Sequence, residues 1–158
     1  MKRVICAMAV VLCVAGCRGN GPSEADVLNV AAKLPAGLPV AALEWKTISS
    51  SVDRKTGTMN LLTGNDAAVR DASAGSYGEG AVLALTTWAQ RDDPHWFGAR
   101  IPGGFVSLET VTVSLGTDGK TTAVYRRFAG SPAREVAGAG DAESRKMEIL
   151  GMRPSQLP

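Results

Sequence analysis

The chain begins with an apolar run that ends at a cysteine. Lys2 and Arg3 precede residues 4–16, which carry no charge. As a helix, this run would reach only about 20 Å at 1.5 Å per residue, whereas the hydrocarbon core of a bilayer is roughly 30 Å thick. Residues 1–16 are therefore predicted to be a cleaved signal peptide.

The pattern downstream changes from one amphipathic helix to several strands. Ser23 can cap a helix over residues 24–34, whose apolar positions follow helical spacing until Pro35. Asn65 and Asp141 can cap two further helices, over 66–74 and up to about residue 151. Period-two or continuous apolar patterns predict strands at 45–52, 58–63, 81–90, 105–114 and 120–128. We read 95–104 as a loop and 129–140 as irregular.

These elements predict one α+β domain over residues 23–158. Two hairpins and a central strand make a mostly antiparallel sheet, with a few flanking helices. The apolar strand at 81–90 is the expected centre of that sheet, because it is apolar on both faces.

The residues before Cys17 point to a lipid anchor. Val14-Ala15-Gly16-Cys17 resembles a bacterial lipobox, in which the cysteine takes a diacylglycerol and becomes the acylated first residue, with palmitate among its acyl chains. Residues 17–22 would then be a lipidated tether. Such an anchor holds a protein on a bilayer, so we expect an envelope lipoprotein that faces the periplasm. Arg18, in place of Asp, is compatible with the outer membrane.

Composition narrows the chemistry of the folded part. The chain has 17 basic and 15 acidic residues, and removal of Lys2 and Arg3 with the signal peptide leaves 15 of each. This balance argues against a nucleic-acid-binding protein. Cys6 and Cys13 leave with the signal peptide, and lipid would occupy Cys17. No thiol then remains for a disulfide or a metal.

The middle of the chain resembles the cytochrome P-460 family. The similarity lies in Gly78-x-Gly80, the apolar strand that follows it up to Trp88, and Tyr125-x-x-Phe128. It covers residues 45–128. The resemblance implies a small antiparallel sheet packed with helices, often in a homodimer. It also implies kinship with periplasmic c-type haem proteins that oxidise hydroxylamine or bind nitric oxide.

The sequence departs from that family at the haem attachment. Family members carry Cys-x-x-Cys-His near the C-terminus, whereas residues 141–158 contain neither Cys nor His. We therefore expect no cofactor, and a small-ligand-binding or interaction module rather than an enzyme. The alternative is an oxidoreductase or nitrogen-oxide-binding protein that holds haem without covalent links, through His95.

Three residues are candidate catalytic groups: His95, Glu109 and Arg100. His95 is the single histidine, and it could be an axial ligand or an acid–base group, or simply a loop imidazole, which we favour. If residues 105–114 alternate strictly, Glu109 faces the apolar side and needs a partner such as Arg100 or Arg126. A β-bulge would instead return it to solvent, and we favour the bulge.

The aromatic side chains give a further ambiguous signal. They could line a ligand pocket, but core or edge packing is the commoner role of such residues. This set comprises Trp45, Trp88, Trp96, Phe97 and Tyr125.

Overall fold

The computed structural model describes residues 28–39, 44–137 and 141–154. The predicted signal peptide, the tether and Cys17 lie outside these ranges. The chain divides into two units, residues 1–30 and 31–158, and the first contributes only residues 28–30 to the description. No helix in the described part of the chain is long and apolar enough to cross a membrane.

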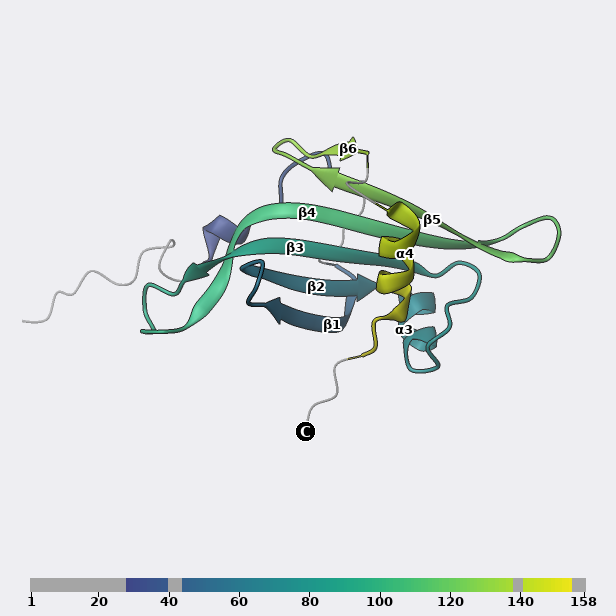
Figure 1. Ribbon diagram of the computed structural model, residues 1–158, viewed down its shortest axis with the longest axis horizontal. Helices are drawn as coiled ribbons and strands as arrows, with labels where there is room; N and C mark the ends of the chain where they lie inside the picture. Colours follow the sequence, from purple (N-terminus) through teal and green to yellow (C-terminus); the bar gives the residue numbers. More distant parts are fainter. Residues whose placement is uncertain (1–27, 40–43, 138–140, 155–158) are drawn as a thin grey trace, which may run out of the picture. The chain divides into compact units, whose positions relative to one another are not determined.

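The second unit contains a six-stranded antiparallel sheet in which every strand pairs with its neighbours in sequence (Figure 1). Two α-helices, α3 between β2 and β3 and α4 after β6, accompany it, and a short 3-10 helix, η1, precedes it. The elements are η1 (Val30–Ala32), β1 (Lys46–Asp53), β2 (Thr58–Gly64), α3 (Asp66–Ala72), β3 (Val82–Asp92), β4 (Arg100–Leu115), β5 (Thr121–Ala129), β6 (Arg134–Val136) and α4 (Ala142–Gly151).

This architecture confirms the predicted α+β class and the five predicted strands. Two of the three predicted caps are present: the side chain of Asn65 accepts a hydrogen bond from the backbone of Ala68, and that of Asp141 from the backbone of Glu143. The third, Ser23, lies outside the described residues. These bonds satisfy N–H groups that the first turn of a helix leaves without partners.

The structure differs from the prediction in three segments. The described part of the predicted helix at 24–34 forms only the short η1, and residues 24–27 lie outside the described ranges. The predicted loop at 95–104 is strand from Arg100 onward, because register shifts near Trp88 accommodate Pro102 within the β3–β4 ladder. The stretch at 129–140, predicted to be irregular, contains β6, which pairs with the end of β5.

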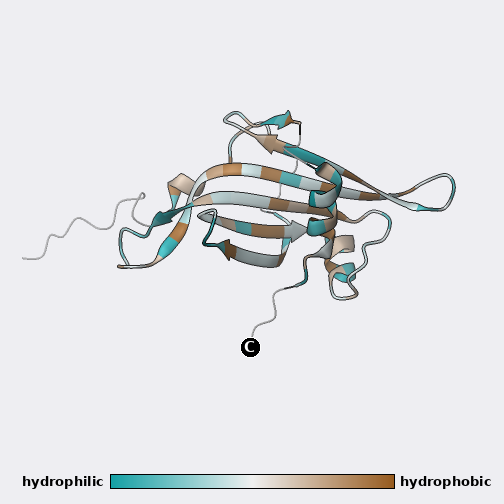
Figure 2. Ribbon diagram, viewed as in Figure 1, coloured by the Kyte–Doolittle hydropathy of each residue, from teal (hydrophilic) through white to brown (hydrophobic). Residues whose placement is uncertain are grey.

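The sheet has two different faces. Hydrophobic bands alternate with hydrophilic ones along β4 (Figure 2), as expected for a strand whose side chains point alternately to each side. We call the face that packs against α3 and α4 the helical face. The opposite face carries a smaller cluster of Ala84, Leu108, Phe128 and Ala133, with Leu38, Trp45 and Phe105 packed against it.

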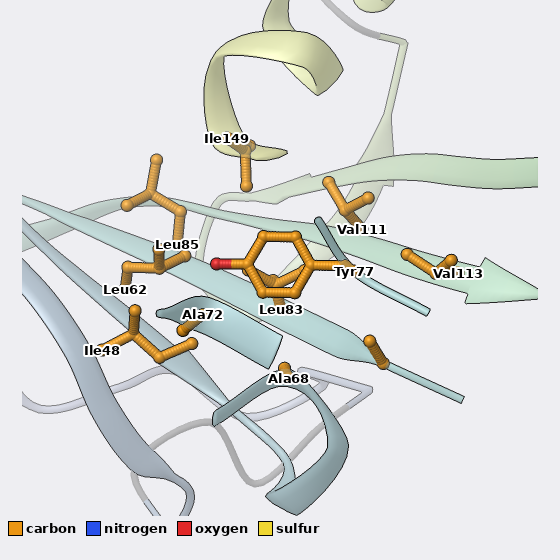
Figure 3. Close-up of a cluster of buried hydrophobic side chains, with 11 residues drawn as sticks. Ile48, Leu62, Ala68, Ala72, Tyr77, Leu83, Leu85, Val111, Val113 and Ile149 are labelled. Atoms are coloured by element: carbon orange, nitrogen blue, oxygen red, sulfur yellow. The ribbon is translucent and has the colours of Figure 1, made fainter. Parts of the chain in front are cut away.

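The main core lies between the helical face and the two helices. Figure 3 shows Ile149 of α4 pointing toward the residues of the strands. Gly64 allows α3 to approach closely, since a Cβ there would lie 2.8 Å from the side chains of both Ala68 and Ile48. The buried members of this core are Ile48, Leu62, Ala68, Ala72, Tyr77, Ala81, Leu83, Leu85, Val111, Val113 and Ile149.

Candidate functional site

A cavity of about 910 Å³ opens on the helical face beside α4. Two rows of side chains that run across neighbouring strands contribute to its lining. The first row contains Leu85, Glu109 and Arg127, which are paired in register on β3, β4 and β5. The second contains Asn60, Thr87 and Ser107, on β2, β3 and β4. We call this space the Glu109 cavity.

Glu109 is the most buried charged group of this lining, with 5% of its surface exposed. The Nε of Arg145 donates a hydrogen bond to its Oε1 at 2.9 Å, and Nη2 donates to its Oε2 at 2.8 Å. The Tyr125 hydroxyl also donates to Oε1, at 2.5 Å. A bidentate guanidinium is the partner best suited to a buried carboxylate. The desolvated charge is therefore compensated on both of its oxygens.

β4 has a bulge near Glu109, as predicted, but the bulge does not return Glu109 to solvent, so that part of the prediction was wrong. β4 pairs without interruption with β5 from Leu108 onward, and its register shifts against β3 lie near Trp88. Strict alternation therefore holds at Glu109 and turns its side chain inward. The register shift lies on the N-terminal side of Glu109.

The partner of Glu109 also differs from the two that the sequence suggested. Arg100 pairs with Asp92 at 3.1 Å, and Arg126 pairs with Glu135 at 3.0 Å. The bond to Glu109 comes from Arg145, 36 positions later on α4. The one signal in the sequence was the spacing of Arg145 and Ile149, which places both on one side of that helix.

The three groups of this cluster set one another's pKa values. Burial alone would raise the pKa of Glu109, but hydrogen bonds from Arg145 and Tyr125 outweigh burial and lower it. Burial and the bond to Glu109 raise the pKa of Tyr125 to about 12. The bond to Glu109 likewise raises the pKa of Arg145. At neutral pH the cluster is thus an ion pair with a neutral phenol.

Arg127 differs from Arg145 in having no such partner. It lies opposite Glu109 on β5 and lines the same cavity. Its Nε is buried and has no hydrogen-bond partner in the described part of the chain. A buried donor without a partner costs about 1–3 kcal/mol, so Arg127 has hydrogen-bonding capacity that the described part of the chain does not use.

The polar row beside Glu109 is held by side-chain hydrogen bonds. The Thr87 hydroxyl donates to Oδ1 of Asn60 at 2.8 Å. Nδ2 of Asn60 in turn donates to Oγ of Ser51 at 3.4 Å. Ser107, 3% exposed, completes the row. These groups place hydroxyl and amide atoms at fixed positions on the cavity floor.

The structure places His95 and Arg100 away from this cavity. His95 is exposed in the β3–β4 connection, where its backbone N–H bonds to the Asp93 carboxylate at 2.8 Å. Trp96 and Phe97 beside it are exposed as well. Neither His95 nor Arg100 is among the lining residues. Of the three candidates, only Glu109 belongs to the cavity.

Most of the aromatic residues have packing roles or point to solvent. Trp88 donates its indole N–H to the Ala32 carbonyl at 2.9 Å, and Trp45 packs in the smaller cluster on the opposite face. Tyr125 is the one member of the predicted aromatic set that lines the Glu109 cavity.

Over residues 28–39, 44–137 and 141–154, no group of three or more His, Cys, Asp or Glu side chains is arranged to hold a metal ion. No family model matches the chain, and no curated protein matches it.

Proposed function

We propose that the folded domain is a small-ligand-binding module and that the Glu109 cavity is its binding site. The observation that carries this proposal is the cavity itself, whose 910 Å³ lies within the range of pockets that hold small organic molecules. Its lining is mostly polar and charged, and Leu85 and Met152 are among its few apolar members. This lining departs from the mainly apolar pockets of many ligand sites, and its fixed polar groups suit a polar ligand that they can orient by hydrogen bonds.

The state of Glu109 favours binding over acid–base catalysis. A general base works best with a pKa near the working pH and with a lone pair free to accept a proton. Glu109 has a lowered pKa and already accepts three hydrogen bonds. Its role in the proposal is to fix Arg145 and Tyr125 at the wall of the cavity.

We propose that the domain is similar to cytochrome P-460 in fold but carries no covalently attached haem. His95 does not fit the role of a haem ligand in this cavity, because it lies on an exposed connection and does not line the Glu109 cavity. We therefore base no step of the proposal on haem.

A variant that fills the cavity tests this function. Ser51 lies on the helical face of β1 and lines the cavity, so Ser51→Trp should obstruct it. A ligand from a metabolite panel, at about 100-fold its dissociation constant, should stabilise the wild-type protein by about 2.7 kcal/mol in thermal unfolding. Ser51→Trp should lose most of this stabilisation.

Ser50→Trp provides the matched control. Ser50 is the neighbouring residue and pairs with Leu61, so its side chain is on the opposite face. This variant should keep the ligand-induced stabilisation. Equal loss in both variants, or no stabilisation by any compound together with no small molecule in natively purified protein, would contradict a binding function.

We further propose that this module is anchored to the envelope through lipid at Cys17. Cys17→Ser removes the acceptor thiol, so the variant should remain unacylated and move from the membrane fraction to the soluble fraction. Fractionation with metabolic labelling by a fatty acid measures both effects. Unchanged membrane association of the variant would refute the anchor and leave the binding proposal intact.

A further inference from the structure

The carboxylates that line the Glu109 cavity are all engaged by the protein itself. Glu109 binds Arg145 and Tyr125, and Glu148 accepts a hydrogen bond from Nη1 of Arg145 at 2.6 Å. Oδ1 of Asp53 accepts bonds from two backbone N–H groups of its own turn, at 2.8 and 3.3 Å. A cationic ligand would have to compete with these bonds.

The basic residues of the same lining are in the opposite state. Among four of them, only Arg145 forms an ion pair within the described ranges. Arg54 and Lys55 lie at the exposed β1–β2 turn, and Arg127 lies on the floor with its Nε buried and without a partner. The cavity thus offers unpaired positive groups and no unpaired carboxylate.

We propose that the ligand of the Glu109 cavity is a small organic oxyanion and that Arg127 binds its carboxylate or phosphate group. This inference rests on the proposed function, because it specifies what that cavity binds. Guanidinium groups recognise both oxyanions through paired N–H donors. The charge of Arg127 helps to lower the pKa of Glu109, but the three hydrogen bonds to the Glu109 oxygens come from Arg145 and Tyr125.

The rest of the floor defines the body of the ligand. The cavity is much larger than an inorganic anion requires, so Arg127 accounts for only one end of its occupant. Asn60, Thr87 and Ser107 offer amide and hydroxyl groups beside the row that contains Arg127. They suit hydroxyl or carbonyl groups on a short carbon chain.

The test follows the Nε–H signal of Arg127 by NMR in the purified full-length chain. Malate and glycerol 3-phosphate serve as the carboxylate and phosphate probes, with glycerol and choline as neutral and cationic controls. The anions should give a saturable shift of the Arg127 signal. Arg127→Gln should weaken anion binding, raising the dissociation constant about tenfold or more. Arg126→Gln, its neighbour on the opposite face that pairs with Glu135, should leave it unchanged.

The pattern of outcomes separates this inference from the proposed function. A saturable shift with one anion supports the inference and identifies the preferred oxyanion. If glycerol, choline or a compound of the metabolite panel binds in the cavity while neither anion shifts Arg127, the oxyanion inference is overturned and a binding function stands. The same loss of anion binding in Arg126→Gln would also overturn it. If nothing binds in either experiment, both proposals fail.

Discussion

Arg145→Met should destabilise the folded domain by about 3–5 kcal/mol at neutral pH, the range measured when one partner of a buried ion pair is removed. The side chain of Glu109 is only 6% exposed, and Arg145 provides two of its three hydrogen bonds. Methionine keeps much of the aliphatic volume and suits a helix, so the loss would report a buried carboxylate that has lost its ion-pair partner and keeps only the Tyr125 hydrogen bond. Chemical denaturation at constant m-value measures it.

The pH dependence of this effect has a defined sign. In the wild type, the pKa of Glu109 is lowered below its ordinary value of 4.5. The pair therefore stabilises the fold above pH 4.5, and this contribution is lost as the pH falls through the lowered pKa. In Arg145→Met, burial should dominate and raise the pKa of Glu109. The difference between variant and wild type should then shrink on acidification, because a protonated Glu109 needs no counter-charge.

Glu148→Gln is the control for Arg145→Met. Glu148 is the other ion-pair partner of Arg145, and the Glu148 side chain is 58% exposed. An exposed ion pair contributes only about 0–1 kcal/mol to stability. Glu109→Gln combined with Arg145→Met should also be less damaging than the sum of the two single variants. A loss in Arg145→Met no larger than in Glu148→Gln would show that Glu109 is hydrated and that the cavity floor is not as described.

The strands and helix caps could be predicted because their signals are local. Alternation of apolar residues depends only on neighbours two positions away, and a cap needs only Asn65 or Asp141 at the start of a helix. The same rule placed Glu109 on the apolar face when applied strictly. The sequence could not show where a bulge would fall relative to Glu109, since Val106 and Leu108 match one phase and Val111 and Val113 the other.

The partners within the site depended on contacts that are distant in sequence. Arg145 reaches Glu109 only because α4 returns to the helical face after β6. Two observations from the structure identified Arg127. The strand register places it opposite Glu109, and the hydrogen bond to that carboxylate comes from Arg145 instead. His95 was a candidate because it is the sole histidine, and the structure agrees with the favoured reading of an exposed loop imidazole.

Ile149→Ala should destabilise the domain by about 2–4 kcal/mol, as expected when a buried side chain is truncated and leaves a cavity. Ile149 is fully buried and is the one described residue of α4 in that state. It sits four positions after Arg145, on the same side of the helix. The hydrophobic contact and the ion pair should thus hold α4 on the sheet together. Met147→Ala on the same helix, 65% exposed, should change stability by less than about 0.5 kcal/mol.

This shared attachment connects packing with the site. If Ile149 and Arg145 hold α4 as one unit, Ile149→Ala combined with Arg145→Met should cost less than the sum of the single variants, because either loss already loosens the helix. Hydrogen exchange should increase in α4 before it increases in β3. Ile149→Ala should also weaken ligand binding, since α4 forms one wall of the Glu109 cavity. Strict additivity, with unchanged binding, would show that the ion pair positions Arg145 without help from the core.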